Sequence, residues 1–297
     1  MPSEFSIFRK NESMSEKKIV ILITAGLIFL TAVFFYTVRD EAEEYRSSIS
    51  KEVVVEQTWK LPKELKEVSA IAFLKEDLLA CIQDEDGIIF LFDLHTSKVV
   101  KKIPFGKGGD YEGIAVHQNI IFVLQANGTI YRINNIDGKP KVESFETPFS
   151  SKNDMEGMFF DVSRNRLLVS VKERDLHSKD FKGIYAIDPE TMELEEAAVY
   201  KMSFKEEMFR PKNKKNEGSF FPSEINRNSK TSEILVLEAR EPKLLILDPN
   251  GKPKALHRLD RKFFPQPEGL AFDNNGNLYI STEGEPGMIH RVNLNTK

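Results

Sequence analysis

A short apolar run led by a polar residue, most often a glutamate followed by glycine, recurs along this chain. Three copies begin with glutamate, at Glu112–Val116, Glu156–Phe160 and Glu268–Phe272. Two more, Ser69–Phe73 and Ser223–Asn226, match the pattern with serine in the leading position. Consecutive leading residues lie 43, 44, 67 and 45 residues apart. A nearly constant step of about 44 residues is typical of a repeat protein whose units share one structure.

The unit that begins at Glu112 has the pattern of four short β-strands. The expected strands are 113–116, 119–125, 129–133 and 141–147, which are apolar, rich in β-branched and aromatic residues, or alternating in polarity. The pairs Asn127-Gly128 and Asp137-Gly138 are turn signals between strands. Four strands in about 44 residues, with no helical period, predict one blade of a β-propeller.

The other units repeat this plan. Strands are expected at 70–74, 78–83, 88–94 and 98–105 in the first unit, at 157–161, 166–172, 183–188 and 194–202 in the third, at 233–238 and 244–248 in the fourth, and at 277–282 and 287–294 in the last. The last unit is one strand short. The segment 53–61 (VVVEQTWKL) can supply that strand and close the ring, which removes the exposed sheet edges of an open array.

The length of the chain sets the number of blades. Residues 53–297 accommodate five units and an excess in the interval between Glu156 and Ser223, and this excess is too short for four further strands. The sequence therefore predicts an all-β, five-bladed propeller closed by an N-terminal strand, with a six-bladed ring as the alternative. The excess is placed at 203–221, a segment rich in lysine and arginine. It is expected to be either a solvated loop or a contact surface for an anionic partner or lipid head groups.

The N-terminus differs from the rest of the chain. Residues 19–38 (IVILITAGLIFLTAVFFYTV) carry no charge and are long enough to cross a hydrocarbon core of about 30 Å as a helix. Four basic residues precede this run and three follow it closely, which favours a cytoplasmic N-terminus. No small-x-small cleavage site follows, so we expect an uncleaved signal anchor in the plasma (inner) membrane rather than a cleaved signal peptide.

The expected organisation has four parts. They are a cytoplasmic segment at 1–18, a single transmembrane signal anchor at 19–38, a linker at 39–52, and a propeller at 53–297 that lies outside the cytoplasm in the cell envelope. The formal net charge of −4 does not suggest nucleic acid binding, which usually needs a basic field. Cys81 is the only cysteine, so it cannot form an intramolecular disulfide, and its apolar surroundings predict a buried thiol.

The recurring glutamates are the candidate site. The first strand of each propeller blade lines the central channel, and its start lies at the same mouth as the end of the second strand. Carboxylates that converge there repel one another and acquire raised pKa values unless a cation intervenes. Oxygen ligands suit Ca²⁺ or Mg²⁺. The predicted metal ligands are Glu112, Glu156 and Glu268, followed by Glu173, Glu238 and Glu283 at second-strand ends.

A structural role for these glutamates is the alternative. Each of them could cap backbone N–H groups or pair with Arg174 or Arg240 and so hold adjacent blades together. The basic residues at the strand ends also have a possible role in binding. Lys172, Arg174 and Arg240 are the expected contacts for an anionic ligand.

Three motifs carry a resemblance to a known family. NDMEGMFFD (153–161), FPSEIN (221–226) and PQPEGLAFDNNGNLYISTEGEPG (265–287) resemble the SdiA-regulated family of membrane-anchored β-propellers, from about residue 53 to the end. The resemblance implies an extracytoplasmic propeller that binds calcium and is sometimes described as phytase-like, without a well-established reaction. Glu112, Glu156 and Glu268 match the family pattern.

Two functions from different classes follow from these observations. The first is a binding or scaffold module that presents a calcium-stabilised face to an extracytoplasmic ligand or protein, and the lack of a nucleophile or base signature favours it. The alternative is a metal-dependent hydrolase acting on a phosphomonoester such as phytate, or on a lactone or ester.

Overall fold

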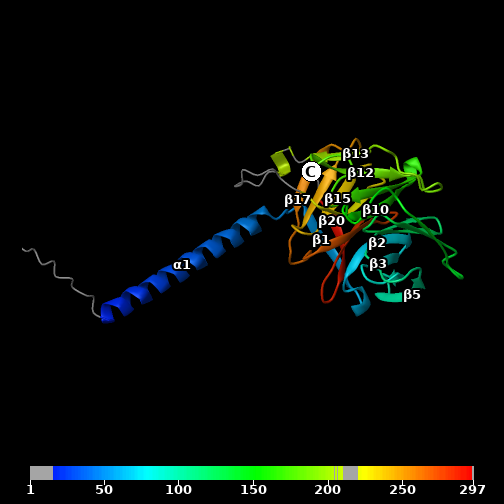
Figure 1. Ribbon diagram of the computed structural model, residues 1–297. Helices are drawn as coiled ribbons and strands as arrows, with labels where there is room; N and C mark the ends of the chain where they lie inside the picture. Colours follow the sequence, from blue (N-terminus) through cyan, green and yellow to red (C-terminus); the bar gives the residue numbers. More distant parts are fainter. Residues whose placement is uncertain (1–15, 204, 206, 210–219, 296–297) are drawn as a thin grey trace, which may run out of the picture. The chain divides into compact units, whose positions relative to one another are not determined.

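The computed structural model describes residues 16–203, 205, 207–209 and 220–295. The chain divides into two compact units, Met1–Ser48 and Ile49–Lys297. The described part of the first unit is one helix, α1 (Glu16–Ser48), and the second unit holds all the described strands (Figure 1).

Helix α1 contains the apolar run of the N-terminus and continues beyond it to Ser48. The segment after Val38 lacks glycine and proline, and Arg39 forms an i,i+4 ion pair with Glu43 at 3.0 Å, which favours continuation of the helix. By length and composition, Ile23–Ser48 could cross a membrane, a test that a signal sequence near an N-terminus would also pass.

The second unit is a five-bladed β-propeller, as predicted, and the six-bladed alternative is wrong. Blade 1 comprises β2 (Val68–Lys75), β3 (Leu78–Gln83), β4 (Ile88–Asp93) and β5 (Lys98–Pro104). Blade 2 comprises β6 (Tyr111–His117), β7 (Ile120–Gln125), β8 (Ile130–Asn134) and β9 (Lys141–Phe145). Blade 3 comprises β10 (Met155–Asp161), β11 (Arg166–Val171), β12 (Phe181–Ile187) and β13 (Tyr200–Ser203).

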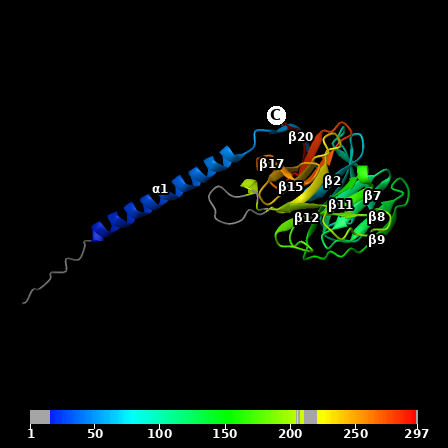
Figure 2. The ribbon, with the colours of Figure 1, turned by 90° about the horizontal axis from the view of Figure 1, so that it is seen from above.

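Blade 4 comprises β14 (Pro222–Arg227), β15 (Ile234–Glu238), β16 (Lys243–Leu247) and β17 (Pro253–Arg258). Blade 5 comprises β18 (Pro267–Phe272), β19 (Leu278–Thr282), β20 (Met288–Leu294) and β1 (Val53–Lys60), which pairs antiparallel with β20. Three short 3₁₀ helices, η1 (Lys63–Leu65), η2 (Val162–Arg164) and η3 (Glu207–Phe209), lie in connections. In Figure 2, the paired strands β7, β8 and β9 of blade 2 lie side by side.

The first strands of the blades form a closed ring. Strand β2 contacts β6, β6 contacts β10, β10 contacts β14, β14 contacts β18, and β18 contacts β2. Each of these strands has a register shift near its start, where the leading residue of the repeat lies. Such bulges re-aim side chains and bend the strand. The repeat seen in the sequence is therefore a repeat of bulges at one end of the inner ring.

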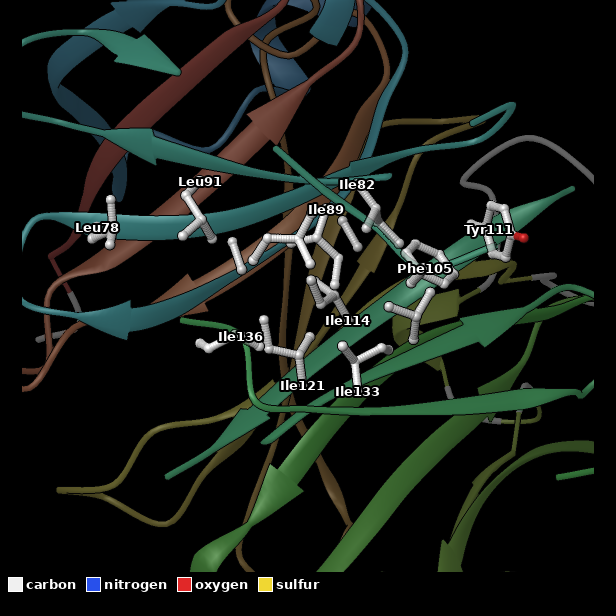
Figure 3. Packing of buried hydrophobic residues seen from close by; sticks show 14 residues of the cluster. Leu78, Ile82, Ile89, Leu91, Phe105, Tyr111, Ile114, Ile121, Ile133 and Ile136 are labelled. Carbon is white, nitrogen blue, oxygen red and sulfur yellow. The ribbon is translucent and has the colours of Figure 1, made fainter. Parts of the chain in front are cut away.

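The hydrophobic core lies between neighbouring blades. The side chains of one cluster come from blades 1 and 2, and those labelled Ile82, Ile89, Ile114 and Ile121 are buried between the two sheets (Figure 3). Four further clusters of described residues pair the remaining neighbours around the ring. Burial between sheets explains why the inner strands read as continuous apolar runs rather than alternating ones.

Some strand predictions differ from the structure. In blade 3 the outer strand is β13 (Tyr200–Ser203), and the expected segment at 194–199 contributes only one isolated bridge, between Ile187 and Leu194. Strand β17 was not predicted, because Lys254 and His257 break the apolar pattern. Most of the segment 203–221, including its residues 210–219, lies outside the described residues.

Candidate functional site

The start of each inner strand brings acidic side chains together. Glu112, Glu156 and Glu268 come from β6, β10 and β18, and their charges act on one another. Glu268 is 7% exposed and Glu156 only 3%. Three of the predicted metal ligands therefore lie near one another at the inner ring, although they come from blades 2, 3 and 5.

Glu156 is held by Lys172, the residue that follows β11. The Lys172 ammonium donates a hydrogen bond to Glu156 Oε1 and forms an ion pair with it. Ser170 Oγ donates to the backbone carbonyl of Glu156. The other carboxyl oxygen, Glu156 Oε2, is buried without a hydrogen-bond partner. Burial and the charge of Glu268 raise the pKa of Glu156, and the Lys172 ammonium opposes this rise.

Glu112 and Glu268 lie in the same electrostatic environment. Burial, followed by the charges of Glu156 and Glu268, raises the pKa of Glu112 to about 11. Burial also raises the pKa of Glu268 to about 7, while the Lys172 ammonium lowers it. Gln266 Nε2 donates to Glu268 Oε1 at 3.3 Å. In the described part of the chain, the Lys172 ammonium is the positive group that acts on Glu156 and Glu268, and the three carboxyls outnumber it.

Glu283 extends this acidic environment toward blade 1. It follows β19, and burial together with the charges of Glu268, Asp84 and Glu67 raises its pKa to about 8. Burial and the charge of Glu67 also raise the pKa of Asp84, whose Oδ1 is buried without a hydrogen-bond partner. The acidic groups therefore continue from the inner ring to the second-strand ends of blades 5 and 1.

Glu224 is a site residue that sequence reasoning missed. It follows Ser223 on β14 and is 1% exposed. Its Oε1 accepts hydrogen bonds from the backbone N–H groups of Met158, at 2.8 Å, and Ile225, at 2.9 Å. Its Oε2 is buried without a partner. Burial raises its pKa well above the usual range, and the charges of Glu156 and Glu268 add to the rise.

A local signal for Glu224 was present in the FPSEIN motif. The repeat pattern places Ser223 in the leading position, at the register shift of β14, and Glu224 follows it by one residue. Only the contact with Met158 of blade 3 shows that Glu224 bridges two blades.

The two serines of the repeat pattern also bridge blades. Ser69 Oγ donates to the carbonyl of Tyr111 in blade 2 at 2.7 Å. Ser223 Oγ donates to the carbonyl of Pro267 in blade 5 at 3.0 Å. These positions join blades 1 to 2 and 4 to 5, so the five leading residues divide into two that connect blades and three that carry carboxylates.

Glu173 and Glu238 lie against basic residues. Glu173 forms an ion pair with Arg240, and Glu238 forms one with Lys243 at 3.3 Å. Burial raises the pKa of Glu238 to about 7, and Lys243 opposes this. Arg240 also lies over the ring of Phe221, at 4.2 Å from its centroid. For Arg174, the backbone carbonyl accepts a hydrogen bond from Asn153 Nδ2 at 2.7 Å.

The donor set fits a hard cation by its chemistry, because every candidate ligand is an oxygen. Among the described residues, Glu156 Oε2 and Glu224 Oε2 have no hydrogen-bond partner, so both oxygens could accept a cation. Within 16–203, 205, 207–209 and 220–295, however, no group of three or more His, Cys, Asp or Glu side chains is arranged to hold a metal ion. A cation at this mouth would need small side-chain movements or further ligands from backbone or water.

These features define a five-bladed propeller with an acidic inner mouth. The sequence model of the SdiA-regulated family matches residues 44–292, so the chain belongs to that family, as the motifs indicated. No curated protein sequence matches the chain significantly.

Solved structures show the same fold at low sequence identity. The chain is similar to a glutaminyl cyclase from Myxococcus xanthus, with a TM-score of 0.59 and 12% identity, over 81% of this chain and 95% of that chain. It is also similar to a structural genomics protein of unknown function from Bacteroides thetaiotaomicron VPI-5482, with a TM-score of 0.50 and 13% identity, over 75% of this chain and 58% of that chain. At such identities the similarity concerns the fold and not the activity.

Proposed function

We propose that this protein is a membrane-tethered propeller that binds a divalent cation, Ca²⁺ in preference to Mg²⁺, at its acidic mouth. The cation-stabilised face would present a binding surface to a ligand or protein partner outside the cytoplasm. The observation that carries the proposal is the group of largely buried carboxyls around the Lys172 ammonium, in which Glu156 Oε2 and Glu224 Oε2 have no hydrogen-bond partner among the described residues.

The chemistry of the site favours calcium. Glu112, Glu156 and Glu268 would supply carboxylate oxygens, and Ca²⁺ accepts six to eight oxygen ligands in loose geometry, including water and backbone carbonyls. Mg²⁺ demands a nearly ideal octahedron and gives up water reluctantly, which suits a site built from three different blades less well. A bound cation would ionise these carboxyls and would link blades 2, 3 and 5.

The tether is α1. Its apolar run could cross a membrane, and the excess of basic residues on its N-terminal side favours a cytoplasmic N-terminus. Alkaline phosphatase fused after Lys297 tests this topology, because that enzyme is active only outside the cytoplasm. An inactive fusion, together with a fluorescent fusion of normal brightness, would refute the orientation.

Calorimetry of the full-length chain in detergent tests cation binding. After treatment with EDTA and removal of the chelator, titration with CaCl₂ should release or absorb heat that saturates, and a Glu268→Gln variant should lose at least about tenfold in affinity. Glu146→Gln, which changes an exposed glutamate of the segment after β9, is the matched control. Absence of heat at millimolar Ca²⁺ and Mg²⁺ would refute the proposal.

A metal-dependent hydrolase is the second candidate, and the position of Lys172 favours it. The ammonium lies against Glu156, so an anionic substrate drawn to a cation there would find a second positive group beside it. The calcium-loaded protein should then release phosphate from phytate or p-nitrophenyl phosphate, or cleave a lactone. If the wild-type protein and a Lys172→Met variant have equal turnover, the result would count against a role of Lys172 in hydrolysis.

A further inference from the structure

A cavity of about 410 Å³ lies on blade 5, and of the acidic groups described above it includes Glu283 but not Glu112, Glu156 or Glu268. Its walls come from three parts of the chain, namely Thr58 of β1, the segment 262–265 before β18, and residues 282–290, which include the hairpin between β19 and β20. We call this cavity the blade 5 pocket. Its volume falls in the range of small-molecule sites, about 300–1,000 Å³.

His290 is, after Thr282, the most deeply buried of the residues that line the blade 5 pocket, and it is 3% exposed. One ring nitrogen, Nε2, lies 2.8 Å from the carbonyl oxygen of Phe263, and the other, Nδ1, lies 2.8 Å from Thr58 Oγ1. Because a carbonyl only accepts, Nε2 carries the proton and Nδ1 accepts from the Thr58 hydroxyl. Phe264 packs edge-on against the same imidazole at 5.1 Å. His290 of β20 therefore connects β1 and the segment before β18, so the pocket is pre-organised without a ligand.

The lining of the pocket combines an aromatic face with two acidic side chains. Phe263 is 39% exposed, and it is the one aromatic ring among the exposed large apolar side chains of the described propeller residues. Glu283 and Glu285 line the same cavity, and Pro286 and Met288 add apolar surface. An aromatic face beside carboxylates is the environment that binds ammonium groups, through the ring quadrupole and through charge.

The protein itself places an ammonium group in this environment. Lys262 Nζ lies 5.3 Å from the centroid of the Phe263 ring. Lys262 is exposed and lies at the rim of the cavity, so its flexible side chain can leave the ring without disturbing the core. The ring face of Phe263 thus has room for an ammonium group, and Lys262 occupies that position in the protein without a ligand.

We propose that the blade 5 pocket binds a small organic cation, an ammonium group attached to a compact apolar body. The ammonium would replace Lys262 on the face of Phe263 and lie beside Glu283, while the apolar body would contact Met288 and Pro286. This ligand class differs from the divalent cation of the inner mouth, and the inference stands without that site. An anionic ligand fits the pocket less well, because two acidic side chains, Glu283 and Glu285, line it beside one lysine. A cation beside Glu283 would favour the ionised form of this carboxyl, whose pKa burial raises to about 8.

The test separates charge from shape. Choline and n-butylamine are titrated into the full-length chain in detergent with EDTA present. Their uncharged counterparts, 3,3-dimethylbutan-1-ol and 1-butanol, are titrated in the same way. Binding is followed by ligand-observed NMR. At least one amine should bind, at least about tenfold more tightly than its uncharged counterpart. Failure of both amines to bind, or equal binding of the amine and the alcohol, overturns the proposal.

Substitutions then locate the site. Glu283→Gln and Phe263→Leu should each weaken amine binding about fivefold or more, whereas Lys262→Met should strengthen it because the internal competitor is removed. Both Phe263 and Glu283 contribute side chains at the pocket surface, so these variants should fold, which the emission of the buried Trp59 checks. Glu146→Gln is the control. Amine binding that is unchanged in all three pocket variants would place the amine elsewhere and refute the site.

Discussion

Replacement of Lys172 by methionine removes the one ammonium group that contacts Glu156 while it keeps most of the volume of the side chain. In the wild type the pair is largely buried, with 18% of the Lys172 side chain and 4% of the Glu156 side chain exposed. Removal of one partner from a buried ion pair costs about 3–5 kcal/mol, because the other charge is left uncompensated. Glu156 can reduce this cost by taking up a proton.

The pH dependence follows from the direction of the pKa shift. Burial and Glu268 already hold the pKa of Glu156 above its value in the unfolded chain, and Lys172 opposes them. A carboxyl whose folded-state pKa is raised destabilises the folded state progressively as the pH rises from the unfolded value through the folded one. Without Lys172 the folded-state pKa is higher still. We therefore expect the variant to lose about 3 kcal/mol at pH 8 and about 1 kcal/mol or less at pH 5.

Urea unfolding of the full-length chain in detergent with EDTA measures this loss. The protein contains one tryptophan, Trp59, whose indole N–H donates to the carbonyl of Leu94 at 2.8 Å. Trp59 lies in β1 of blade 5 and packs near Tyr279, so its emission reports unfolding of the propeller. Midpoints and slopes at pH 5 and pH 8 yield the difference between variant and wild type.

A matched control separates burial from loss of any lysine. Lys254 forms an ion pair with Glu233 in which 57% of the lysine side chain is exposed. Lys254→Met should therefore cost at most about 1 kcal/mol, with little dependence on pH. If Lys172→Met loses the same free energy at pH 5 and pH 8, or no more than the control, then Lys172 does not compensate the buried carboxyls and the reasoning fails.

Three further outcomes test the site. Glu224→Ala should lower the free energy of unfolding in urea by about 2–4 kcal/mol, because two backbone N–H groups lose their acceptor. Glu224→Gln should lower it by less than about 1 kcal/mol, and equal losses in the two variants would contradict this account. Gly157→Ala should lose about 3 kcal/mol, because Gly157 has φ +79° and an added Cβ would lie 2.8 Å from the Cα of Glu224; a variant with wild-type stability would refute the strain. Wild-type stability in EDTA should fall as the pH rises from 5 to 9, since the raised folded-state pKa values of Glu268, about 7, and Glu283, about 8, favour the protonated form; a rise over this range would be the contrary result.

The sequence alone determined the architecture, because the architecture depends on local patterns. Strands of β-branched and aromatic residues, turn pairs such as Asn127-Gly128, and a step of about 44 residues define a blade and its number of copies. The uncharged run 19–38 predicts a long apolar helix, and α1 contains it. Each of these patterns lies within one short stretch of sequence. They can therefore be recognised without knowing which distant residues are in contact in the fold.

Only the tertiary structure decided how the acidic residues are grouped. Glu173 and Glu238 are at second-strand ends like Glu283, but Glu173 lies against Arg240 of blade 4, and Glu238 lies against Lys243, its partner across the β15–β16 hairpin. Glu224 joined the site through a contact with Met158 in the neighbouring blade. The physical reason is that these environments depend on which strands and blades are neighbours and on the register shift at the start of each inner strand, and a repeat pattern encodes neither of these.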